Sequence, residues 1–201
     1  DPELLANGDR RNVLDHYRYW TVPAIVADLN TKRHGLQIAI ENWQHDLNIG
    51  SIVRTANAFN VSGVHIVGKR DWNKRGAMVT DRYLTVNHHA TVADFAAWCK
   101  ERNLPIIGID NVDGSKRLEG AQLPESCVLL FGQEGAGMSE EGVAVCEVVL
   151  VEELAAMHLA FEERVQAENC CAAVGNEDGA ARGAEGFQCH FGLLHKKYAS
   201  I

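Results

Sequence analysis

The chain has 201 residues, of which 46% are hydrophobic and 23% are charged, and its formal net charge is −8. This length favours one well-buried domain, and this composition is near the average of soluble globular proteins and does not indicate a disordered or fibrous protein. No apolar run approaches the roughly 18 to 20 residues of a membrane span, and the N-terminal segment lacks the apolar centre of a signal peptide, so we expect a cytoplasmic protein without a membrane partner.

Cysteine and histidine spacing argues against disulfides and against a metal site. The six cysteines lack a short repeated spacing, and Cys170 and Cys171 are adjacent, which suits neither a disulfide framework nor a zinc knuckle. His88 and His89 would point in different directions on any regular element, and no HxxxH or CxxC pair occurs. We therefore expect reduced thiols and no bound metal.

The first part of the chain changes from irregular to regular patterning near Leu36. Residues 1–34 are expected to form a helical and irregular N-terminal extension. GLQIAIEN then predicts a short strand, and apolar residues at helical spacing predict a helix from Ile49 to Phe59. VSGVHIVG predicts a second strand, which Gly68 ends.

The same alternation continues toward the C-terminus. TVADFAAWCKERN predicts an amphipathic helix with Phe95, Trp98 and Cys99 on one side, and LPIIGID predicts a buried strand. SCVLLFG predicts another strand, SEEGVAVC a short helix that begins at Ser139, and EVVLVE a further strand. Alternating strands and helices indicate an α/β fold with a mostly parallel sheet and helices on both faces. Beyond Glu153 a long amphipathic helix is predicted, followed by a Gly-rich segment without a clear period.

Basic residues cluster in the N-terminal half, after the second predicted strand. Residues 1–90 carry 11 Lys and Arg against 9 Asp and Glu, whereas residues 91–201 carry 8 against 18. The net negative charge counts against a nucleic-acid partner, because phosphate neutralisation supplies most of such affinity. In the segment GKRDWNKRGAMVTDR, however, five cations surround Trp72, and cations around an exposed aromatic residue suit an RNA backbone and a stacked base. A solvated loop fits the charges equally well.

The first candidate motif is HDLNIGSIVRTANAF, His45 to Phe59, where a strand ends and a helix begins. Open parallel sheets bind ligands at the carboxyl ends of their strands. Gly50 permits a tight turn, and the Asn48 amide both donates and accepts. Arg54 lies among apolar residues of the predicted helix, where a charge must face an opening or a partner; a structural ion pair with a carboxylate is the alternative.

The second candidate motif is FGQEGAGMSEE, Phe131 to Glu141, again between a strand and a helix. Its three glycines, Gly132, Gly135 and Gly137, allow the main chain to approach a ligand closely and to expose amides toward it. The order GxxGxG differs from the dinucleotide fingerprint GxGxxG, and no acidic residue follows at the expected spacing. The pattern therefore disfavours NAD as the ligand.

Together the two motifs resemble those of a known family. NIGSIVRTANAF is similar to the first motif of the SpoU/TrmH RNA methyltransferases, and LLFGQEGAGMSEE is similar to the second, in the same order and at a similar separation. The resemblance extends from about Leu36 to Leu150, more than half of the chain. It implies a SPOUT-type domain over residues 35–201 whose C-terminal part forms a trefoil knot, a rare exception to the rule that chains do not thread loops.

The resemblance also implies transfer of a methyl group from S-adenosylmethionine to a ribose 2′-hydroxyl of tRNA or rRNA, by a homodimer. Asn48 would help to shape the active site, and Arg54 would orient the hydroxyl or the adjacent phosphate, since arginine is charged at ordinary pH and is a poor base. Glu134 matches the acidic residue of the second motif and would pair with Arg54, hold the loop or simply begin the helix. The implied cofactor-binding residues are Gly132, Gln133, Gly135, Gly137, Met138 and Asn169. The implied RNA-binding residues are Lys69, Arg70, Lys74, Arg75 and Arg82.

The C-terminal part departs from the family pattern from about residue 151. The third family motif, an apolar-Pro stretch followed by Ser-x-Asn at the start of a helix, is not present. Small residues follow Asn169, but Ala167 stands where the family has serine. Two alternatives therefore remain: an RNA-binding relative that has lost catalysis, and another nucleotide-dependent α/β enzyme.

Overall fold

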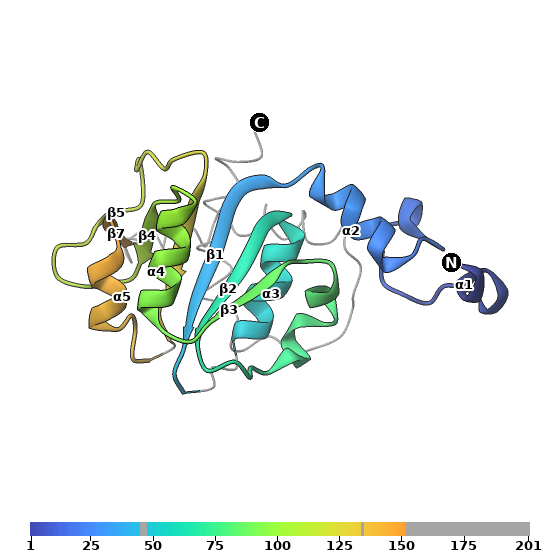
Figure 1. The fold of residues 1–201 in the computed structure, drawn as a ribbon, viewed down its shortest axis with the longest axis horizontal. Helices are drawn as coiled ribbons and strands as arrows, with labels where there is room; N and C mark the ends of the chain where they lie inside the picture. The colour runs from blue at the N-terminus through green and yellow to red at the C-terminus, as the bar shows by residue number, and fades with distance from the viewer. Residues whose placement is uncertain (45–47, 134, 152–201) are drawn as a thin grey trace, which may run out of the picture.

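A seven-stranded parallel sheet forms the centre of the computed structural model, which describes residues 1–44, 48–133 and 135–151 (Figure 1). The strand order is β3-β2-β1-β6-β4-β7-β5, and every pair of neighbouring strands is parallel. The strands are β1 (His34–Asn42), β2 (Val61–Gly68), β3 (Val86–His89), β4 (Ile106–Ile109), β5 (Lys116–Arg117), β6 (Cys127–Phe131) and β7 (Val148–Val151).

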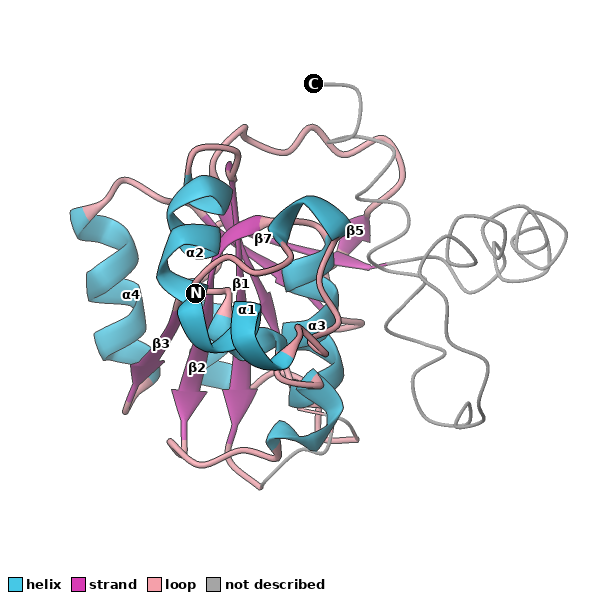
Figure 2. Cartoon of the chain, turned by 90° about the vertical axis from the view of Figure 1, so that its right-hand side faces the viewer, coloured by secondary structure: helices cyan, strands magenta, loops and turns pink. Residues whose placement is uncertain are grey.

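Helices cover both faces of this sheet, which confirms the predicted layers. On one face, α3 (Ile49–Ala58) buries Ile52, Val53 and Ala56 against alternate residues of β1, β2 and β6. On the other face, α4 (Val92–Glu101) and α5 (Glu140–Val145) cover the strand residues whose side chains point away from α3. Phe95 and Cys99 of α4 are fully buried there. Figure 2 shows α4 and α3 on opposite sides of the strands.

Most of the strands and helices predicted from Leu36 onward are present within a few residues of their expected limits. The strands β3 and β5 were not predicted. β3 is an edge strand with the sequence VNHH, and β5 has only two residues, both exposed, so neither shows the apolar pattern of a buried strand. None of the helices in the described ranges is long and apolar enough to span a membrane. The predicted helix beyond Glu153 lies outside the described residues.

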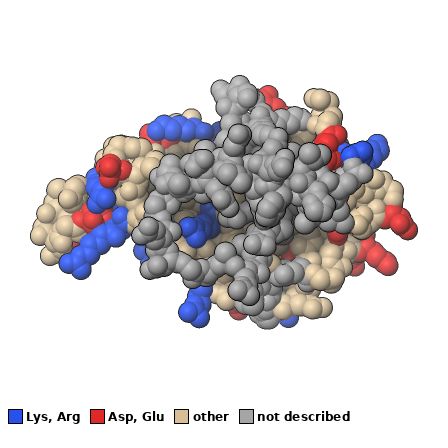
Figure 3. All heavy atoms as spheres, turned by 180° about the vertical axis from the view of Figure 1, so that it is seen from behind, with Lys and Arg blue, Asp and Glu red and all other residues tan. Residues whose placement is uncertain are grey.

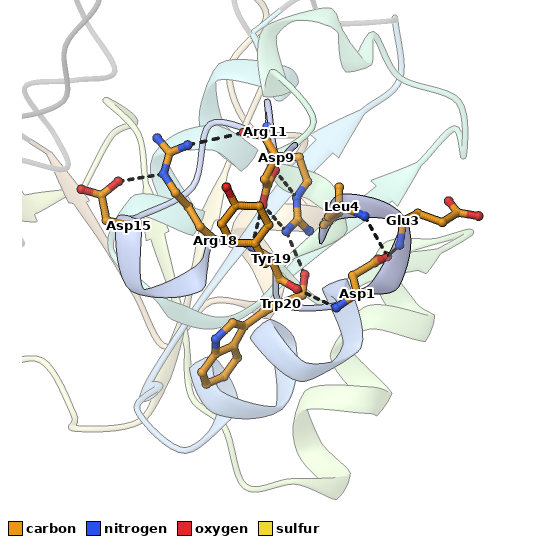
Figure 4. Close-up of polar contacts among 9 residues, drawn as sticks. All are labelled: Asp1, Glu3, Leu4, Asp9, Arg11, Asp15, Arg18, Tyr19 and Trp20. Carbon is orange, nitrogen blue, oxygen red and sulfur yellow. Dashed lines mark hydrogen bonds and ion pairs between the residues drawn. The ribbon is translucent and has the colours of Figure 1, made fainter. Parts of the chain in front are cut away.

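The N-terminal part consists of α1 (Pro2–Asn7), the 3-10 turn η1 (Asp15–Tyr17) and α2 (Val22–Asn30). Its centre is Asp9, whose buried carboxylate accepts hydrogen bonds from the Arg11 guanidinium (2.7 and 2.9 Å) and from the backbone N of Tyr19 (2.9 Å) (Figure 4). The hydrogen bond from Arg11 is the main reason that the pKa of Asp9 is far below its usual value. These bonds organise a segment that has few buried apolar residues.

Arg33 joins this part of the chain to the sheet. Its guanidinium donates to the carbonyl of Val61 at the start of β2 (2.9 Å), to Asn60 Oδ1 (3.1 Å) and to the carbonyl of Tyr83 (2.6 Å). Burial lowers the pKa of Arg33. The planar guanidinium thus holds together α2, β2 and the end of the basic loop that follows β2.

A buried histidine pair lies between β2, β3 and α4. His65 Nδ1 is 2.9 Å from His89 Nε2, and His65 Nε2 is 2.8 Å from Gln37 Oε1. The rings pack against Phe95 and Trp98. His88 instead points outward, as expected for adjacent residues of a strand. No group of three potential metal ligands occurs among the described residues.

Candidate functional site

The carboxyl ends of β1, β6 and β4 meet at one edge of the sheet because the three strands are parallel neighbours. The segment leading to Asn48 follows β1, the glycine-rich loop follows β6, and Asp110 follows β4. Both predicted motifs are therefore brought to the edge where open parallel sheets bind ligands. This edge is the candidate functional site.

The glycine-rich loop after β6 is closed by its own backbone. Gln133 N donates to Gly137 O (3.0 Å), and Gly137 N donates to Gln133 O (2.9 Å). A Cβ atom on Gly132 would lie 2.1 Å from the backbone of Gly137 and Met138, so only glycine permits this closure. Gly135 and Ala136 at the loop tip are exposed, and no hydrogen bond joins them to another residue of the described ranges.

Two carboxylates hold the end of this loop. Asp110 Oδ2 accepts from Met138 N (2.6 Å), while its Oδ1 accepts from Asn111 N (2.7 Å). Glu41, which is fully buried in β1, accepts from Ser139 N (2.8 Å) and from Ser139 Oγ (2.5 Å). The Ser139 hydroxyl in turn accepts from Gly142 N (3.0 Å) and so begins α5, as predicted. The loop is thereby fixed to β4 at one point and to β1 at the next.

The end of β1 also contacts both neighbouring loops. Trp43 N donates to the side chain of Gln133 (3.2 Å). The Asn42 side-chain amide donates to the carbonyls of Lys69 (2.8 Å) and Asp71 (3.0 Å) in the loop after β2. Asn42 Oδ1 and Trp43 Nε1 are buried and have no hydrogen-bond partner among the residues that the structure describes. Buried polar atoms of this kind are costly unless they are bonded, so their position beside the glycine-rich loop is typical of a binding site.

Arg54 lies on α3, which packs against the loop after β2. Gly50 allows this packing, because a Cβ atom there would lie 2.8–2.9 Å from Asn73 O, Ala77 N and Gly76 Cα. Arg54 is one helical turn further along the same side and is exposed. Arg54 forms no ion pair with any residue in the described ranges, so the alternative of a structural ion pair receives no support there. Its charge is exposed to solvent.

The loop after β2 carries the predicted basic cluster. Lys69, Arg70, Lys74, Arg75 and Arg82 are all exposed. The expectation of an exposed aromatic residue among them was wrong, because Trp72 is half-buried and packs against the core under α3. Lys74 lies 5.5 Å from the centre of the Trp72 ring and 3.2 Å from the Asp81 carboxylate. Figure 3 shows most of the visible basic side chains on the half of the molecule that holds the N-terminal elements.

The remaining predicted site residues are distributed as follows. Asn48 precedes α3, and its carbonyl accepts from Ile52 N (3.0 Å). Met138 is buried at the end of the glycine-rich loop. Glu134 and Asn169 lie outside the described residues. The sequence interpretation missed Glu41 and Asp110, although a signal exists: each is an acidic residue at the end of an apolar parallel strand.

Comparison with known proteins agrees with these observations. The model of the SpoU rRNA Methylase family matches residues 35–153. The tRNA (guanosine(18)-2'-O)-methyltransferase of Escherichia coli (strain K12) is 25% identical over 122 residues, which cover 59% of this chain and 53% of that protein. The chain thus spans about half the length of the curated relatives it matches.

Solved structures show the same fold. The SpoU methyltransferase AviRb from Streptomyces viridochromogenes, in complex with the cofactor AdoMet, superposes with a TM-score of 0.53 at 21% identity and covers 60% of this chain and 49% of that chain. The A. aeolicus TrmH/SpoU tRNA modifying enzyme superposes with a TM-score of 0.55 at 19% identity and covers 66% and 72%, respectively. At these identities the likeness concerns the fold.

Proposed function

Because the chain belongs to the SpoU rRNA methylase family, we propose that it transfers a methyl group from S-adenosylmethionine to a ribose 2′-hydroxyl of tRNA or rRNA. The observation that carries this proposal is the meeting of its two motif loops at one sheet edge. There the glycine-rich loop is fixed to β1 through Glu41, and Arg54 stands exposed on the adjoining helix.

The glycine-rich loop fits a cofactor held mainly by main-chain groups. Its base is fixed by Glu41 and Asp110, whereas Gly135 and Ala136 at its tip are exposed and uncommitted. Such an arrangement presents backbone groups without a change in loop conformation on binding. We assign cofactor binding to Gly132, Gln133, Gly135, Gly137, Met138 and Asn169. S-adenosylmethionine supplies an electrophilic methyl group when bound.

The residues of this chain would act chiefly by orienting the RNA. Arg54 donates to the ribose hydroxyl or the adjacent phosphate and holds the 2′-oxygen toward the cofactor loop, which is the largest share of such catalysis. Arg54 does not remove the proton, because a guanidinium is charged at ordinary pH. Asn48, at the start of the same helix, shapes this region, and Glu134 supplies the acidic group of the second motif.

Binding of the RNA backbone is assigned to the basic loop. Its exposed cations lie on the segment that packs against the helix of Arg54, so phosphates held there would bring a neighbouring ribose toward that arginine. Lys69, Arg70, Lys74, Arg75 and Arg82 form this surface. A homodimer would place two such surfaces on one particle and increase the positive charge available to RNA.

Completion of the proposed site is assigned to the C-terminal part. We propose that residues after Val151 form the trefoil knot of the SPOUT fold and that Asn169 contributes to the cofactor pocket from there. The segment follows β7, whose carboxyl end lies at the same sheet edge as the glycine-rich loop. That position supports a role in closing the pocket, although Ala167 replaces the serine of the family motif.

The test is methyl transfer from labelled S-adenosylmethionine to total tRNA and, separately, to rRNA. Arg54→Ala is expected to reduce incorporation by about 100-fold or more with the cofactor Kd unchanged, since positioning is lost and the cofactor loop is intact. Lys100→Ala removes an exposed cation from α4 on the other face of the sheet and serves as the matched control.

Three results would be informative in different ways. Incorporation that depends on Arg54 supports the proposal. Cofactor binding without incorporation into either RNA contradicts the proposed substrate. RNA binding without cofactor binding identifies a relative that has lost the chemistry.

A further inference from the structure

Met78 and Val79 form an exposed apolar tip on the basic loop. The two residues are 62% and 53% exposed. Both residues have left-handed backbones, with φ of 48° and 70°. A β-branched residue such as valine adopts this conformation only when its surroundings enforce it. An apolar pair held in an unfavourable conformation and exposed to solvent is available for contact with a ligand.

The surroundings do enforce this conformation. Two 3-10 turns, η2 (Lys74–Ala77) and η3 (Thr80–Arg82), flank the tip, and the Thr80 hydroxyl donates to Ala77 O (2.7 Å) across it. Lys74 and Asp81 form an ion pair between the two turns (3.2 Å). Below the tip, Gly76 is packed against Gly50 of α3. The tip is therefore a built feature with fixed support on both sides.

The charges around the tip define what can approach it. Arg70, Arg75 and Arg82 are exposed, and none forms an ion pair with another residue in the described ranges. Association of two copies through this tip would place the same cations opposite one another, which is unfavourable. A polyanion with apolar faces complements both parts of the surface, and RNA with unstacked bases has this chemistry.

The tip also lies near the proposed reaction centre. Both η2 and η3 pack against α3, the helix that carries Arg54. We propose that Met78 and Val79 pack against an unstacked base of the bound RNA while the surrounding arginines hold its phosphates, so that the tip fixes the nucleotide beside the one that Arg54 orients. This inference rests on the proposed function in one respect, that the ligand is RNA.

The experiment compares the wild type with the double variant Met78→Asn, Val79→Asn. Asparagine tolerates left-handed backbone, so the loop is expected to keep its shape while the apolar surface is removed. Affinity for a short single-stranded RNA is expected to fall by about tenfold, whereas affinity for the same sequence as a duplex stays unchanged. The salt dependence of binding also stays unchanged, because no phosphate contact is lost. Emission of a 2-aminopurine placed in the single strand, which changes when the wild type binds, should no longer respond.

Two further variants make the result decisive. Val79→Gly removes the side chain, and glycine adopts the left-handed backbone without strain. It is also expected to weaken single-strand binding, and this loss would then be due to the missing apolar contact and not to misfolding of the loop. Leu14→Asn replaces an apolar residue of the N-terminal part that is 66% exposed, and it is expected to leave binding of both RNAs unchanged.

Unchanged single-strand affinity in the double variant would overturn the inference, as would an equal loss for duplex and single strand or a change of oligomeric state. The proposed function is tested by a separate measurement, which is methyl transfer by the wild type. If the wild type methylates RNA and the double variant binds like it, only the inference fails. If no RNA is methylated but single-strand affinity falls as described, only the proposed activity fails.

Discussion

Glu41 and Ser139 are 98 positions apart in the chain, yet two hydrogen bonds join them, one from the backbone N and one from the hydroxyl of Ser139. Glu41 is the penultimate residue of β1, and Ser139 follows the glycine-rich loop. Both donors in this contact belong to Ser139, so the Glu41 carboxylate is bonded here by neutral groups. The pair connects the two motifs physically, and it makes a buried carboxylate part of the loop support.

Replacing Glu41 by Gln is expected to lower the free energy of unfolding by about 1–3 kcal/mol, because at least one of the two donors of Ser139 loses its acceptor. A chain of this size would then lose about 2–4 °C in Tm per kcal/mol. The Kd for S-adenosylmethionine should rise more than the KM for RNA, since the loop is the part disturbed. Scanning calorimetry measures the change in Tm, titration calorimetry measures the Kd, and methyl-transfer kinetics give the KM. Ser139→Ala removes the hydroxyl bond to Glu41 and also the acceptor of Gly142 N, so it should destabilise the protein at least as much; wild-type stability of either variant would contradict this account.

Gly132→Ala is expected to destabilise the protein by about 1–3 kcal/mol and to abolish cofactor binding, because the new Cβ atom would meet the backbone of Gly137 and Met138 at 2.1 Å. Gly63→Ala in β2 is the matched control. Its Cβ would have no neighbour closer than 3.4 Å. Chemical denaturation of both variants should therefore separate them clearly, and a tolerated Gly132→Ala would show that the loop is not closed as described.

The buried histidine pair predicts a pH dependence of stability. Burial lowers the pKa of His65 to about 3, with further contributions from His89 and Arg102. In the unfolded chain a histidine has a pKa near 6.5, so between about pH 6.5 and pH 3 only the unfolded state binds this proton. Stability therefore falls as the pH falls through this window, by up to about 1.4 kcal/mol per pH unit, and is unaffected by this group above it.

Acid titration of the free energy of unfolding tests this prediction. His65→Gln should be less stable than the wild type at neutral pH but should show a shallower decline toward low pH. His16→Gln, at an exposed position, should leave the slope unchanged. A slope that is identical in the wild type and in His65→Gln would assign the acid sensitivity to other groups.

Arg33→Lys is expected to destabilise the protein by about 1–3 kcal/mol, because an ammonium group cannot reach the four acceptors, on Asn30, Asn60, Val61 and Tyr83, that the planar guanidinium joins. The change retains the positive charge, so any effect reports geometry. Limited proteolysis should then cleave near Tyr83 or between α2 and β1 sooner than in the wild type. Lys32→Gln, which removes only an exposed ion pair with Asp28, should behave like the wild type.

The sequence predicts the buried elements well and the surface elements poorly. The apolar runs of β1, β2 and β6 predict buried strands directly, because strands covered on both faces are almost continuously apolar. β5 has no such pattern, since its pairing with β7 depends on a fold already formed.

The site residues that the sequence predicts are likewise those that form a local pattern. Glycine and arginine in the two motifs are visible as sequence patterns, whereas the role of Glu41 depends on a partner far along the chain. Trp72 shows the opposite error, because a loop tryptophan among cations suggests exposure until the packing under α3 is seen.

The strand order also has a consequence for how the protein is made. β1, β2 and β3 are consecutive in the chain, so this half of the sheet can pair early, but the other edge of β1 pairs with β6, Leu36 with Cys127. During synthesis that edge stays unpaired until residues 127–131 have left the ribosome, and pairings so distant along the chain form slowly. The growing chain therefore exposes an apolar strand edge in the middle of its future core, and chaperone binding to nascent chains is expected to end when β6 emerges.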